Sequence, residues 1–87
     1  MNLTFPNESR SYDVTRNAVR FWGYMSSIEC SFFVTVDALR RIHPHPVQDK
    51  ASFLDAFDAH RDLIYKTAAK VFARGRKGSY ELVPADF

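Results

Sequence analysis

The segment AVRFWGYMSSIECSFFVT, residues 18–35, decides the fold because two stretches rich in aromatic and β-branched residues flank a short polar break. Such side chains favour β-strands, since they pack well on a pleated surface. The segment therefore predicts an antiparallel hairpin. Matching apolar positions places Phe21 opposite Cys30 and closes the turn at residues 25–26. A longer loop is the alternative, because neither turn residue favours positive φ.

Alternation along the two strands gives the hairpin two unlike faces. The face that suits a core carries Val19, Phe21, Gly23, Ile28, Cys30, Phe32 and Val34. The opposite face carries Arg20, Trp22, Tyr24 and Phe33. If the first face packs on helices, the second turns three aromatic rings and a guanidinium toward solvent.

Two helices are expected after the hairpin. Thr35 is a predicted N-cap for a short helix that ends at the HPHP sequence of residues 43–46. A second, long helix is predicted from Asp49 or Ser52 to Arg74, because its apolar residues fall in one arc of about 120–140°. The apolar residues of that arc are Phe53, Leu54, Phe57, Ile64, Tyr65, Ala68, Val71 and Phe72.

Short strands are expected near both ends of the chain. Residues 79–83 alternate in polarity and stop at Pro84, and residues 2–5 suit an edge strand. The expected fold is a single α+β domain over residues 1–87. Its small antiparallel sheet combines the hairpin with the C-terminal and N-terminal strands, and one short and one long helix pack against it.

Composition narrows the class of protein. The 87 residues are 46% hydrophobic and 25% charged, which excludes disordered and low-complexity chains. A formal net charge of +2 is too small to signal a strongly basic nucleic-acid or membrane binder. Cys30 is the one cysteine, so no internal disulfide is possible and the reducing cytoplasm is the expected compartment. No export signal or membrane span is expected.

The stretches FPNESRSYD, AVRFWGY, SFFV and AAKVFARGRKGSYEL resemble domain-of-unknown-function family 1488, a family of small stand-alone bacterial proteins. The likeness extends over most of the chain in order and spacing, and it is weakest over the HPHPVQDK linker. It implies an α+β domain with a β-hairpin, two helices and a closing strand. It implies no activity, cofactor or catalytic residue.

The aromatic face of the hairpin is the first candidate site. Three different partners could bury it. The first is internal: the N-terminal segment, with Leu3, Phe5, Tyr12 and Val14, lies across the face or adds a strand beside it. A second copy of the chain is another, because Trp, Tyr, Phe and Arg are common in interface cores. Single-stranded nucleic acid is the third, since aromatic rings on a sheet stack bases.

A basic segment is the second candidate site, with phosphate as its ligand. Lys66, Lys70, Arg74, Arg76 and Lys77 would attract a nucleic-acid backbone, and the glycines between them would let it approach. The same residues need no ligand if the cations stabilise a helix C-terminus and the glycines end it.

Histidine, cysteine and carboxylate patterns assign no catalytic, cofactor or metal site. His43, His45 and His60 lack the ligand spacing of a zinc site, and His60 is expected to find one hydrogen-bond partner. Cys30 is predicted to be buried and inert. The expected function is therefore a non-catalytic interaction or assembly module, such as a homodimer. The alternative is a weak nucleic-acid-binding or regulatory module.

Overall fold

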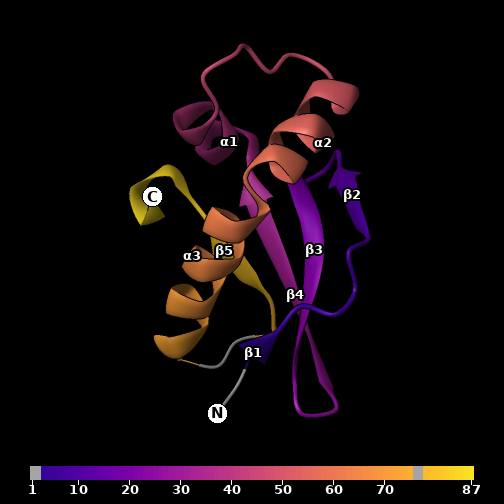
Figure 1. The fold of residues 1–87 in the computed structure, drawn as a ribbon, viewed down its shortest axis with the longest axis vertical. Helices are drawn as coiled ribbons and strands as arrows, with labels where there is room; N and C mark the ends of the chain where they lie inside the picture. Colours follow the sequence, from indigo (N-terminus) through magenta and orange to yellow (C-terminus); the bar gives the residue numbers. More distant parts are fainter. Residues whose placement is uncertain (1–2, 76–77) are drawn as a thin grey trace.

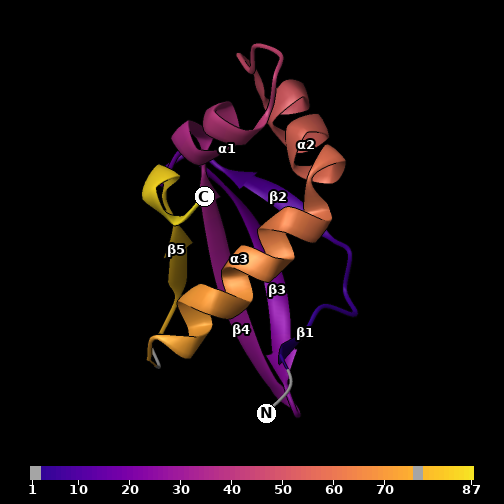
Figure 2. The same cartoon turned by 60° about the vertical axis from the view of Figure 1, so that its left-hand side comes forward.

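A computed structural model of the chain describes residues 3–75 and 78–87. Within these residues a mixed sheet lies against three α-helices, as Figures 1 and 2 show, so the α+β prediction is confirmed. The strands are β1 (Leu3–Thr4), β2 (Arg10–Asp13), β3 (Ala18–Met25), β4 (Ile28–Thr35) and β5 (Tyr80–Leu82). The helices are α1 (Val36–Ile42), α2 (Lys50–Ala59) and α3 (Arg61–Ala73), and a 3₁₀ turn, Pro84–Asp86, follows β5.

The hairpin of β3 and β4 forms in a different register from the predicted one. Phe21 lies opposite Phe32, not Cys30, and the turn falls at residues 26–27, with Ser26 at a φ of 57°. This register stacks the two phenylalanine rings with centroids 5.3 Å apart. The prediction was off by two residues. Because side chains alternate with a period of two, that shift leaves every residue on its predicted face.

Both N-terminal strands pair with β3. The predicted edge strand forms as β1, where Leu3 lies opposite Met25, and β2 pairs further along, with Tyr12 opposite Val19. The sequence did not single out β2, because its residues RSYD are mostly polar.

The C-terminal strand forms where it was expected but runs parallel to β4, which corrects the prediction of an antiparallel sheet. Three helices separate β4 from β5, so the chain crosses back over the sheet before it adds the strand.

The predicted long helix is two helices that meet at His60, whose φ of −126° and ψ of 27° lie outside the helical region. A straight helix from Lys50 to Arg74 would span about 37 Å, whereas the molecule measures 36 × 23 × 23 Å. The break lets both halves follow the core. Thr35 and Asp49 are N-caps as predicted, and Asp49 and Ser52 form a capping box.

The core lies between the sheet and the helices, which cover the same face of it (Figure 2). The face of β3 and β4 predicted to suit a core is the one that packs there. The largest fully buried side chains in this layer are Phe21, Phe32, Phe57, Leu39, Ile64 and Leu82. In the described ranges, no helix combines the length and apolarity needed to cross a bilayer.

Candidate functional site

The outer face of the sheet, the face turned away from the helices, brings together the four residues predicted there. Arg20, Trp22 and Tyr24 are partly exposed on β3, whereas Phe33 on β4 is only 4% exposed. The prediction that three aromatic rings face solvent is therefore wrong for Phe33, which is buried although it lies outside the main core. Arginine side chains of the outer face lie over the Phe33 ring and shield it from solvent.

Two guanidinium groups lie over the Phe33 ring. The Arg16 Cζ atom is 4.1 Å from the ring centroid and the Arg20 Cζ atom is 5.7 Å from it. Arg20 also lies 5.1 Å from the Trp22 ring centroid. Cation–π attraction and the arginine stems together stabilise this arrangement. Arg16 was not predicted as part of the face, because it lies in the turn before β3, where alternation carries no information.

Hydrogen bonds fix the remaining side chains of the outer face. An Nη of Arg20 donates to Ser31 Oγ at 3.1 Å, while its Nε is buried without a hydrogen-bond partner among the described residues. The Tyr24 hydroxyl donates to Glu29 Oε2 at 2.7 Å, and this bond raises the pKa of the phenol above its ordinary value. Glu29 therefore lies opposite Tyr24, not opposite Trp22 as the predicted register placed it.

The apolar side chains of the N-terminal segment do not cover the outer face, although the Asn7 side chain lies within hydrogen-bond reach of the Tyr24 hydroxyl. The strands of this segment lie beside β3, but Leu3, Phe5 and Tyr12 pack against the core on the helix side. Phe5 stacks on Tyr65 of α3 with ring centroids 4.2 Å apart. Val14 is 79% exposed. The segment therefore adds strands beside the hairpin, which is one of the two internal arrangements that the sequence suggested, and its apolar side chains do not lie across the outer face.

The described residues of the basic segment lie on the other layer of the molecule. Lys66 and Lys70 are exposed on α3, on the helix side, so they do not share a surface with Trp22 and Tyr24. Arg74 forms an ion pair with Asp86 at 2.9 Å. Gly75 has a φ of 148°, a conformation that favours glycine at a helix end. Arg76 and Lys77 lie outside the described residues.

Two of the three histidines form a pair. His43 Nδ1 and His60 Nε2 are 3.0 Å apart, so the ring at the end of α1 is joined to the ring at the break between α2 and α3. This contact gives His60 the single partner that was expected for it. Across the described residues, no group of three or more histidine, cysteine or acidic side chains is placed to hold a metal ion.

Cys30 is only partly buried, which corrects its predicted burial. It borders a hollow of about 110 Å³ near the hairpin tip, together with Met25, Ile28, Phe72 and Tyr80. Ile28 is 56% exposed because the tip extends beyond the helices. The Cys30 thiol has one weak contact, to the Ile28 carbonyl oxygen at 3.9 Å, and this contact supplies no base to activate it.

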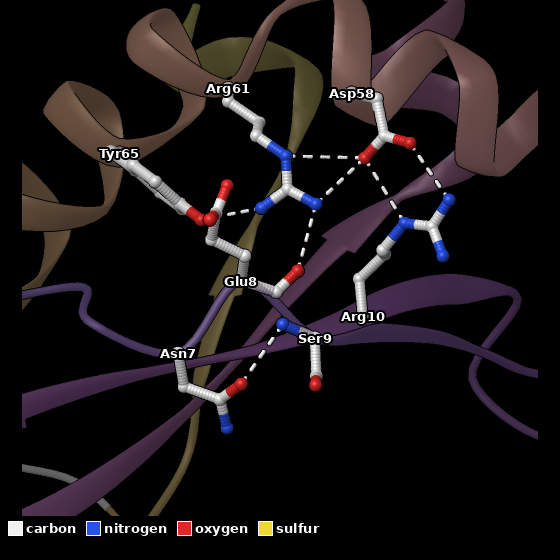
Figure 3. A network of polar contacts seen from close by, with 7 residues as sticks. All are labelled: Asn7, Glu8, Ser9, Arg10, Asp58, Arg61 and Tyr65. Atoms are coloured by element: carbon white, nitrogen blue, oxygen red, sulfur yellow. Dashed lines mark hydrogen bonds and ion pairs between the residues drawn. The ribbon is translucent and has the colours of Figure 1, made fainter.

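A polar network missed by the sequence joins β2 to the helices (Figure 3). Arg10 donates two hydrogen bonds to Asp58, at 3.0 and 2.7 Å, and Arg61 donates to the same carboxylate at 2.8 Å. Arg61 also donates to the Tyr65 hydroxyl and to the Glu8 carbonyl oxygen, both at 2.8 Å. The bond from Arg10 is the main cause that holds the pKa of Asp58 below its ordinary value.

Comparisons with known proteins agree with the fold. A protein of unknown function of the DUF1488 family from Shewanella loihica PV-4, solved by crystallography, has 18% sequence identity and a TM-score of 0.82. The match covers 94% of each chain. No curated protein matches the sequence. The family model described as "Protein of unknown function (DUF1488)" matches residues 3–83. The chain therefore belongs to the DUF1488 family.

Proposed function

We propose that this chain is a non-catalytic assembly module that binds protein through the outer face of its sheet. The observation that carries this proposal is the partly exposed Trp22, with Arg20 stacked beside it, on a face that the helices leave uncovered. Tryptophan, tyrosine and arginine dominate the binding energy of protein interfaces. Trp22 is the expected centre of the contact, and Arg20 gives it a directional polar group.

A second copy of the chain is the partner that the charges favour. The outer face carries charges of both signs. Arg16 and Arg20 lie at the β3 side of the face, whereas Glu29 and Glu81 lie on β4 and β5. A mixed surface suits a symmetric contact, because each charge of one copy can meet its opposite on the other.

A nucleic-acid ligand has less support. Glu29 and Glu81 flank the aromatic rings and repel phosphate, and the exposed lysines of α3 lie on the opposite layer. A catalytic role has less support as well, because the Cys30 thiol, the histidine pair and the Asp58 carboxylate lie in separate places. The cytoplasm is the compartment we propose, since a domain with one cysteine needs no oxidising environment.

Sedimentation velocity over protein concentrations from about 10 to 500 µM tests this proposal. We expect the wild-type chain to self-associate and Trp22→Ala to shift it toward monomer. Leu63→Ala is the matched control, because Leu63 is an exposed apolar side chain on α3. Wild type that stays monomeric at the highest concentration contradicts the proposal. Salt-sensitive binding of single-stranded oligonucleotides by fluorescence anisotropy would support the nucleic-acid alternative instead.

A further inference from the structure

Three rows of residues cross the outer face along β3 and β4. Arg20 lies opposite Phe33 in the first row, Trp22 opposite Ser31 in the second, and Tyr24 opposite Glu29 in the third. Arg20 and Glu29 therefore each lie one row from Trp22, on opposite sides of it. Figure 1 shows the two strands side by side along the long axis of the molecule.

Both of these charges lack an ion-pair partner within the described residues. Arg10, Arg40, Arg61 and Arg74 each lie within 3.4 Å of an aspartate carboxylate. The two arginines stacked on Phe33 have no such contact, and Glu29 accepts only the neutral Tyr24 hydroxyl. Among the described arginines away from this face, Arg41 on α1 also has no ion pair, and the other four are each paired with an acid of the chain.

We propose that two copies of the chain pack outer face to outer face about a twofold axis beside Trp22, so that Arg20 of each copy meets Glu29 of the other. The axis lies in the plane of the interface and runs perpendicular to the strands. A rotation about it places the first row of one copy over the third row of the other. Packed sheets lie about 10 Å apart, a gap that arginine and glutamate side chains together can bridge. Each dimer then gains two ion pairs around a central pair of Trp22 rings.

Glu81 distinguishes this axis from a twofold axis along the strands, which would bring Arg20 to Glu81 instead of Glu29. Glu81 lies on β5 opposite Phe33, in the same row as Arg20 but two strands away from β3. In the proposed dimer, Glu81 of one copy faces β5 of the other copy, in the row of Glu29. It is therefore two strands away from Arg20 of that copy. A charge change at Glu81 therefore leaves the proposed ion pairs intact, and Glu81→Arg is a matched control for Glu29→Arg.

The inference rests on the proposed function, and an exchange of charges tests it separately. Arg20→Glu and Glu29→Arg are each expected to weaken self-association about tenfold or more, because each places like charges together twice in the dimer. An equimolar mixture of the two variants should associate within about threefold of the wild-type strength, since both ion pairs form again in the mixed dimer, one with its native signs and one with its signs reversed. Arg20→Glu mixed with Glu81→Arg should show no such recovery: Glu81→Arg still associates with itself like the wild type, whereas Arg20→Glu does not gain a strong partner, because its new carboxylate still meets Glu29 of the other copy.

The outcomes separate the two claims. Wild type that dimerises through Trp22 but shows no recovery in the mixture overturns the axis and leaves the assembly module standing. Wild type that remains monomeric overturns both. If Arg20→Glu lacks the native circular dichroism spectrum, Glu29→Arg is compared with Glu29→Gln. The reversal should then weaken association about tenfold more than the neutral change, and equal effects contradict the proposed pairing.

Discussion

Arg10 on β2 and Asp58 on α2 form a two-pronged ion pair across 48 positions of the sequence, with donor–acceptor distances of 3.0 and 2.7 Å. Arg61 holds the same carboxylate from the first turn of α3. Asp58 therefore ties the edge of the sheet to the point where the two helices meet.

Asp58→Asn should lower the free energy of unfolding by about 1 kcal/mol at neutral pH, because two charge-assisted hydrogen bonds become weaker and both arginines lose their counter-charge. The partial exposure of these side chains keeps the effect moderate. Urea unfolding followed by circular dichroism measures it. Glu81→Gln is the control, since this exposed acid has no ion pair within the described residues, and an equal loss there would contradict the role given to Asp58.

The same pair predicts how stability depends on pH. The arginines hold the pKa of Asp58 below its ordinary value in the folded chain. Its contribution is therefore fully present above the pKa of an unfolded carboxyl, about 3.9, and is lost as the pH falls through the lowered folded pKa. The stability difference between wild type and Asp58→Asn should shrink from pH 6 toward about pH 2. A difference that is constant over this range would contradict the assignment.

Gly23→Ala should destabilise the fold by about 1 kcal/mol, because a methyl group at this position has no room. Its Cβ would lie 2.8 Å from the Phe5 ring and 3.0 Å from the Phe32 ring. Moving Phe5 aside would disturb its stack on Tyr65. Gly78→Ala is the matched control, since a Cβ there meets nothing within 4 Å. Thermal unfolding of the two variants should differ, and equal melting temperatures would contradict the packing described for β3.

His43→Ala should lower stability by about 0.5–1.5 kcal/mol, because it removes the hydrogen bond that joins the end of α1 to the break at His60. His45→Ala removes an exposed ring whose centroid lies 5.7 Å from that of His43 but which takes no part in the His43–His60 hydrogen bond, so its effect should be smaller. Urea unfolding of both variants tests this difference. Similar losses from both would show that the loop, and not the histidine pair, stabilises this end of the molecule.

Local pattern predicted much of this fold. Alternation along residues 18–35 identified the two faces of the hairpin, and the N-caps at Thr35 and Asp49 followed from residue type and position. The register was missed because it depends on Ser26 adopting a positive φ and on Phe21 stacking on Phe32, and neither is a local propensity.

The break at His60 was missed for a related reason. Phe57 and Ile64, seven residues apart on either side of it, keep the helical spacing, so the apolar stripe continues across the interruption. The contacts of Arg10 with Asp58 and of Arg16 with Phe33 join elements that only the folded chain brings together. Periodicity along one strand or helix cannot reveal them.

The central claim, that copies of this chain meet at the indole of residue 22, is tested most directly by the chain's own fluorescence. Trp22 is the one tryptophan in the sequence, so its emission reports on the outer face alone. As protein concentration rises, the account predicts that the emission maximum shifts to shorter wavelength and that quenching by acrylamide weakens. Emission and quenching that stay the same from dilute to concentrated solution would contradict it.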